Sequence, residues 1–138
     1  MIRETIVVFD VNGKAIYWHE PDDRSAGYVP DSDDLWDVLW EHRDHLGGYA
    51  HTHPGHGPVS PSGIDLTTFD AIEKGLGKQL LWPILSFDQM VCVVRNPLFK
   101  SKPNVTHRWT VAGPLTIEFD WVDELRRKSG SEEAPSPV

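Results

Sequence analysis

Apolar and β-branched residues dominate two early runs of the chain, residues 5–11 and residues 14–18, as is typical of β-strands. Asn12 and Gly13 stand between these runs, and both residue types accept the positive φ angles of a type I′ turn. The pattern therefore predicts a β-hairpin that is closed by a two-residue turn.

A first helical pattern follows a polar stretch. Residues 20–34 are acidic and contain Pro and Gly, which predicts a loop with a short strand near Tyr28 and a helix cap within residues 31–34. One helix face is then formed by Leu35, Leu39, His42 and Leu46, with Trp36 and Trp40 beside it. Gly47 and Gly48 are expected to end this helix and to lead into a further strand.

A second helix and several strands are predicted in the remainder of the chain. The helix face is formed by Leu66, Phe69, Ile72 and Leu76, and Gly75 and Gly77 close it. Strand-like runs occupy residues 80–87, 90–95, 105–111 and 115–119, and a loop covers 96–104. Residues 121–128 read either as a short helix or as a continuation of the last strand. We expect a single mixed α/β domain over residues 1–128, with a central mixed sheet of about five to seven strands flanked by helices.

Composition narrows the possible functions. The chain has 138 residues and a net charge of −8, which disfavours binding to the phosphate backbone of nucleic acids. We see neither a signal peptide nor an apolar run near the ~20 residues of a membrane span, so a cytoplasmic location is expected. Cys92 is the single cysteine and reads as a buried strand thiol. Residues 129–138 lack apolar content and predict a disordered tail.

Residues 49–65 carry the strongest indication of chemistry. His51 and His53 are two positions apart after a short apolar run, so in a strand both imidazoles point to the same face. A loop rich in Gly, Pro and Ser then leads to Ser62 and Asp65 at the start of the second helical pattern. Two neutral imidazoles and one carboxylate form a three-ligand zinc set that leaves the fourth tetrahedral position for water, as in catalytic sites.

Each half of this pattern also has a structural explanation. A His-x-His pair in a strand is often a solvated surface pair, and Ser62 with Asp65 is a variant of the helix capping box. The occurrence of both halves in one short stretch favours the metal site.

The His-Thr-His-Pro sequence at residues 51–54, followed by Ser-Gly-Ile-Asp at residues 62–65, resembles the signature of the JAMM (MPN+, JAB-domain) zinc metalloprotease family. The order of elements over about residues 1–95 is similar to that fold, in a prokaryotic, RadC-like layout. The resemblance implies a JAB/MPN-like domain with a cytidine-deaminase-like arrangement. It further implies that His51, His53 and Asp65 bind Zn²⁺.

The same resemblance implies roles for further residues. Ser62 would help to bind the oxyanion, and a glutamate from an early strand would act on the zinc water. Glu4 fits this role by its position, and Glu20, at the end of the second hairpin strand, is the alternative. Residues 54–61 are one residue longer than the usual family loop, which indicates an insertion and leaves Ser60 as an alternative hydroxyl.

The resemblance therefore implies a zinc metallopeptidase or isopeptidase, a deubiquitinase-like hydrolase that cleaves a peptide or isopeptide bond with a zinc-activated water. We expect cleavage after a small residue in an extended, ubiquitin-like tail, with residues 55–61 bordering a narrow channel that the tail could enter as an added strand. His56 is expected near the mouth of the site and not as a fourth ligand.

Two other functions stand beside this one. The first is a catalytically silent JAB-domain binding module, which the presence of all three ligand residues disfavours. The second is a RadC-like role in DNA processing, which the acidic composition disfavours. The expected partner is a protein or peptide substrate, without membrane or nucleic acid, and the sequence leaves the oligomeric state open.

Overall fold

The computed structural model describes residues 2–95, 109–112 and 115–131. A six-stranded mixed sheet with the order β2-β1-β3-β4-β5-β6 forms its centre, and only β3 and β4 run parallel. The elements are β1 (Ile6–Asp10), β2 (Ala15–His19), α1 (Asp33–Glu41), β3 (Leu46–Thr52), α2 (Gly63–Leu76), β4 (Trp82–Leu85), β5 (Met90–Arg95), β6 (Trp109–Val111) and α3 (Val122–Lys128). The predicted mixed α/β class is thus confirmed.

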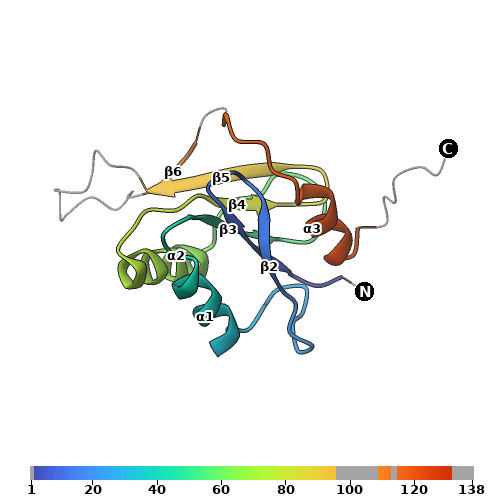
Figure 1. Ribbon diagram of the computed structural model, residues 1–138. Helices are drawn as coiled ribbons and strands as arrows, with labels where there is room; N and C mark the ends of the chain where they lie inside the picture. The colour runs from blue at the N-terminus through green and yellow to red at the C-terminus, as the bar shows by residue number, and fades with distance from the viewer. Residues whose placement is uncertain (1, 96–108, 113–114, 132–138) are drawn as a thin grey trace.

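Helices cover both faces of this sheet, with α1 and α2 on one face and α3 on the other (Figure 1). The alternation of side chains along β1 explains the two layers, because Ile6 and Val8 face α1 and α2 while Val7 and Phe9 face α3. No helix in the described part of the chain has the length and apolar character needed to cross a membrane.

The predicted hairpin is present, but the predicted type I′ turn is wrong. Gly13 N donates to the Asp10 carbonyl at 2.9 Å, and Gly13 has a φ of 83°, whereas Asn12 does not adopt a positive φ. This geometry is a type I turn followed by a left-handed glycine, with a bulge in the strand pair. The Asp10 carboxylate stabilises the wider turn, because it accepts hydrogen bonds from the backbone of Asn12 and Lys14.

The predicted end of the first helix is also wrong. Leu46 is the first residue of β3, and Gly47 and Gly48 lie inside that strand. A Cβ atom would lie 2.2 Å from the Asp10 carbonyl oxygen at Gly47, and 2.1 Å from the Leu81 carbonyl oxygen at Gly48. Both glycines therefore allow neighbouring backbones to approach, and neither caps a helix.

We expect Gly48→Ala to destabilise the protein by about 2 kcal/mol, because the new methyl group would overlap with the Leu81 carbonyl and the Phe9 ring. Gly27→Ala is the matched control, since no atom lies within 4 Å of a Cβ at that position. Urea unfolding of the two variants measures the difference, and equal stabilities would contradict this packing argument.

Several other predictions differ from the structure or lie outside it. Near Tyr28 there is only an isolated bridge with Ser25 and no regular strand. Residues 115–119 are not a strand, because they run past the β1–β2 turn, where Asp120 N donates to the Gly13 carbonyl. Residues 96–108 and 132–138 lie outside the described residues, and they contain the whole of the predicted loop, part of a predicted strand and most of the predicted tail. Ser129 is fully buried, so the folded part extends past residue 128.

Candidate metal centre

Two neighbouring strands bring three of the predicted side chains to one face of the sheet. β1 and β3 are antiparallel, and Ile6 pairs with His51. Glu4 lies two residues before Ile6, and His53 lies two residues after His51. The same antiparallel register therefore places Glu4 beside His53. Side chains at these four positions share the face that α1 and α2 cover, as expected from strand alternation.

Helix α2 delivers the fourth side chain. Ser62 is its N-cap, and a complete capping box joins Ser62 to Asp65: Asp65 N donates to Ser62 Oγ at 3.0 Å and Ser62 N donates to Asp65 Oδ2 at 2.9 Å. This box holds the Asp65 carboxylate against the histidines, at 3.1 Å from His51 Nε2 and 3.0 Å from His53 Nε2. Asp65 therefore belongs both to the helix cap and to the proposed metal site, and Ser62 holds it in place.

The donor atoms of His51, His53 and Asp65 surround a common point. The two Nε2 atoms are 3.1 Å apart, and each lies beside a different oxygen of the carboxylate: His51 Nε2 is 3.1 Å from Oδ1 and His53 Nε2 is 3.0 Å from Oδ2. Three ligands of a tetrahedral zinc ion, each about 2.0–2.1 Å from the metal, would lie about 3.3–3.4 Å apart. The side chains are thus already close to the spacing that such an ion requires.

Protons alone satisfy this triangle poorly. If both Nε2 atoms carry a proton and donate to Asp65, the two donors face each other at 3.1 Å. If one Nε2 atom lacks its proton, its lone pair faces the carboxylate instead. A divalent cation removes both conflicts because all three groups can donate lone pairs to it, so the residues fit a metal ion.

Glu4 lies slightly farther from this point. Its carboxylate is 4.0 Å from His53 Nε2, and Glu4, His51 and His53 form a group whose ligand atoms are close enough to hold a metal ion. Glu4 is 7% exposed, and burial raises the pKa of its carboxyl to about 7, with Asp65 adding to the rise and His53 opposing it. A carboxyl with a pKa near neutral can both accept and return a proton.

The pKa values of Asp65 and His53 shift in the directions expected for a charged pair. Burial acts to raise the pKa of Asp65, but hydrogen bonds from His51 and His53 outweigh it and hold that pKa below its usual range. The hydrogen bond to Asp65 raises the pKa of His53 against the effect of burial. These shifts favour the ionised form of the Asp65 carboxyl and the protonated form of the His53 imidazole, and a metal ion at this site would compete with that proton.

Packing orients the His51 ring. It makes edge contacts with Tyr49 and Phe69, at centroid distances of 6.2 and 5.9 Å. Its Nδ1 atom is buried and has no hydrogen-bond partner within the described part of the chain. Aromatic neighbours, and not an acceptor on Nδ1, thus direct Nε2 of His51 towards Asp65.

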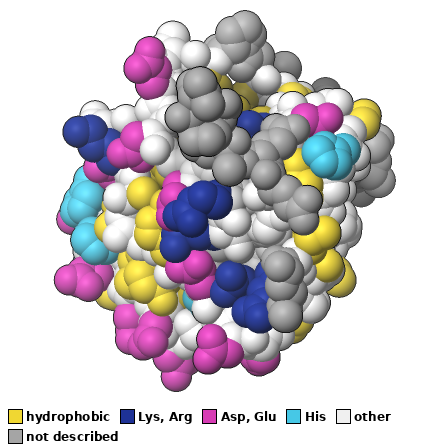
Figure 2. Space-filling view, turned by 90° about the vertical axis from the view of Figure 1, so that its right-hand side faces the viewer, with side chains coloured by type: hydrophobic (Ala, Val, Ile, Leu, Met, Phe, Trp, Pro, Cys, Tyr) yellow, Lys and Arg dark blue, Asp and Glu magenta, His cyan; other side chains and the backbone are white. Residues whose placement is uncertain are grey.

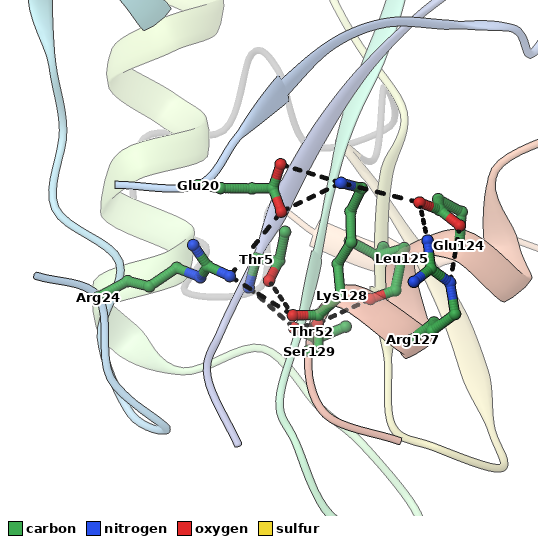
Figure 3. A network of polar contacts seen from close by, with 9 residues as sticks. All are labelled: Thr5, Glu20, Arg24, Thr52, Glu124, Leu125, Arg127, Lys128 and Ser129. Atoms are coloured by element: carbon green, nitrogen blue, oxygen red, sulfur yellow. Dashed lines mark hydrogen bonds and ion pairs between the residues drawn. The ribbon is translucent and has the colours of Figure 1, made fainter. Parts of the chain in front are cut away.

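A buried polar network supports the centre from the opposite face of the sheet (Figure 3). Thr52, between the two histidines, accepts a hydrogen bond from Thr5 N at 3.1 Å and contacts Ser129 Oγ at 2.7 Å. Ser129 Oγ donates to the Leu125 carbonyl in α3 at 2.8 Å. These bonds fix the strand that carries Glu4 to the strand that carries the histidines.

Glu20, the alternative base, is not part of the centre. Its carboxylate pairs with Lys128 Nζ at 3.0 Å on the α3 face, among the residues of Figure 3. His56 is also elsewhere, since it is exposed and lies 3.9 Å from the Asp88 carboxylate. Glu4 is therefore the glutamate that the structure brings to the histidines.

A cavity of about 610 Å³ opens over the centre. Its lining contains the predicted Glu4, His51, His53, Ser62 and Asp65 together with Ala26, Gly27, Tyr28, Val29, Asp31, Tyr49, Pro54, Ile64, Thr68 and Phe69. Ser60 and the rest of residues 55–61 do not line it, so the expectation that this loop borders the channel is wrong. The loop packs instead against the β4–β5 turn, where Ser86 Oγ donates to the Gly57 carbonyl.

Residues 26–31 and Tyr49 are the part of the cavity that the sequence did not reveal. The loop carries no metal-binding or catalytic motif, and its position depends on long-range contacts. His19 Nε2 donates to the Pro30 carbonyl at 2.6 Å, and Ser25 N donates to the Tyr28 carbonyl at 2.7 Å.

We expect Ser62→Ala to lower the free energy of unfolding by about 1 kcal/mol, the typical effect of losing an N-cap. Ser32→Ala is the matched control, because Ser32 Oγ caps α1 by accepting from Leu35 N at 3.1 Å. Thermal unfolding should show similar losses for both variants, with bound metal retained in each. Loss of metal in Ser62→Ala alone would mean that the hydroxyl, and not only the backbone of Ser62, positions Asp65.

A comparison with models of protein families found no matching family, and a search of curated proteins found no match to this chain.

Proposed function

We propose that this chain is a zinc-dependent metallopeptidase or isopeptidase of the JAMM (MPN+/JAB-domain) type. The observation that carries the proposal is the meeting of His51, His53 and Asp65 within 3.1 Å of one another, with Glu4 beside them in an open cavity. A structural zinc site would be closed by a fourth protein ligand, whereas a site that opens to a cavity suits catalysis.

Each side chain has a definite task in this proposal. Bound zinc would supply Lewis acidity and would acidify a coordinated water. Glu4, whose carboxylate lies 4.0 Å from His53 Nε2, accepts a proton at that carboxylate and returns it to the departing amine. The Ser62 hydroxyl accepts from Asp65 N, so its own hydrogen stays available for the oxyanion of the substrate.

The burial of the centre supports a substrate with small residues at the bond. Glu4 and His51 are 7% and 4% exposed, so the reacting groups lie at the bottom of the cavity. An extended tail ending in small residues reaches such a centre more easily than a folded loop. The tail cannot pair with β1 or β3, because both strands already have neighbours on each side. In this proposal the extended tail therefore lies across the cavity and does not add a strand to the sheet.

Substrate size provides the test. We expect a tail ending in Gly-Gly to be cleaved from a reporter amine at least about tenfold faster than the same tail ending in Leu or Phe, since bulky side chains would meet the buried centre. Rates are compared with zinc-loaded protein by release of the amine. Equal rates would remove the size argument, and no hydrolysis of either peptide with zinc bound would favour the silent binding module.

Charge disfavours the alternative role in DNA processing. The chain carries 21 acidic and 13 basic residues. In Figure 2, the described Lys and Arg side chains on the face shown lie among Asp and Glu side chains and form no continuous basic surface. Such a surface is what the phosphate backbone requires.

A further inference from the structure

The cavity contains a polar group that the proposed mechanism does not use. Tyr49 lines the cavity and is 5% exposed, but its hydroxyl has no hydrogen-bond partner among the described residues. Within the described residues, the side-chain polar atoms that are fully enclosed and lack a hydrogen-bond partner are Arg24 Nε, His51 Nδ1 and Trp121 Nε1. The Tyr49 hydroxyl is not one of them, so it is not fully enclosed. It therefore opens into the cavity, where a bound molecule can reach it.

Three carboxylates line the cavity into which this hydroxyl opens. It lies within electrostatic reach of Asp31, Asp65 and Glu4, and the described residues that line the cavity include neither Lys nor Arg. A divalent cation at the histidines would balance the charges of Asp65 and Glu4. Asp31 would then hold the remaining negative charge of the cavity.

Asp31 is placed firmly enough to act as a binding group. It follows Pro30, whose carbonyl accepts the hydrogen bond from His19, and it precedes Ser32, the N-cap of α1. Within the described residues its carboxylate forms neither an ion pair nor a hydrogen bond. The carboxylate and the Tyr49 hydroxyl are thus two unpaired acceptors in one cavity.

We infer that Asp31 and Tyr49 form a subsite for an arginine side chain of the substrate, adjacent to the metal centre. A guanidinium group carries five N–H donors in a planar fork, so it can donate to the carboxylate and to the phenol oxygen together. A neutral side chain of the same shape lacks the attraction to the unbalanced charge. The inference rests on the proposed function in one respect, that the bound molecule is a substrate. The binding preference itself does not depend on hydrolysis.

The test compares two small probes of equal shape, Nα-acetyl-arginine amide and Nα-acetyl-citrulline amide, by NMR titration of the zinc-loaded protein. We expect arginine to bind at least about threefold more tightly than citrulline, as suits a partly exposed ion pair. Asp31→Asn should abolish this preference. Tyr49→Phe should weaken arginine binding while leaving some preference.

Asp37→Asn is the matched control, because it makes the same change of charge on the exposed side of α1, away from the cavity. It should keep the full preference for arginine. Equal binding of the two probes, or an unchanged preference in Asp31→Asn, would overturn the subsite. If the preference is present while no peptide is hydrolysed, the proposed function fails and the subsite stands.

Discussion

The double variant His51→Ala, His53→Ala will bind less than about a tenth of the zinc that the unmodified protein holds, for which we expect about one ion per chain. Both imidazoles direct Nε2 to the same point, 3.1 Å apart, so their removal leaves Asp65 and Glu4 as the only nearby donors among the described residues. Elemental analysis after gel filtration measures the metal, and circular dichroism follows the fold. Because His51 is buried in a central strand, a moderate loss of stability should accompany the loss of metal.

A second histidine pair in the same chain offers the control. His42 and His45 lie after α1 with Nδ1 and Nε2 also 3.1 Å apart, but they are accompanied by no carboxylate in the described structure that completes a metal-binding group. The double variant His42→Ala, His45→Ala should keep its zinc. Full zinc retention without His51 and His53 would end the metal hypothesis.

The sequence was informative about the site where its residues are local. His51 and His53 share a strand, and Ser62 and Asp65 share one helical turn, so strand alternation and capping rules predict their directions. The meeting of the two groups depends on the packing of α2 against β3, which no single segment encodes. The histidine strand and the acid at the helix start were therefore predictable, but the distance of 3.0 Å between His53 Nε2 and the Asp65 carboxylate was not.

Glycines and long-range partners account for the errors in the fold. A Gly-Gly pair after a helical pattern usually indicates a helix end, but here Gly47 and Gly48 permit close contact with the backbone of Asp10 in β1 and of Leu81 just before β4. The choice between Glu4 and Glu20 depended in the same way on sheet register. Glu20 faces α3 because its partner Lys128 lies there, and neither strand sequence indicates that contact.

The substitution Glu4→Gln will leave zinc bound and the fold intact, while hydrolysis of a Gly-Gly reporter peptide falls by about 10²-fold or more. The amide keeps the size of the carboxylate but cannot accept the proton. Asp65, at 3.0–3.1 Å from both histidines, still completes the metal site. Glu4, at 4.0 Å from His53 Nε2, lies outside that closest set of donors.

Glu20→Gln is the matched control for this prediction. Glu20 pairs with Lys128 on the other face of the sheet, so its loss should change the rate by less than about twofold, with only a small effect on stability. Measurement of zinc content beside the rate separates the roles that a carboxylate could have. If Glu4→Gln loses its zinc, Glu4 is a ligand, consistent with its place in the Glu4, His51 and His53 group. If it keeps its zinc and its full rate, the proton is carried by another residue.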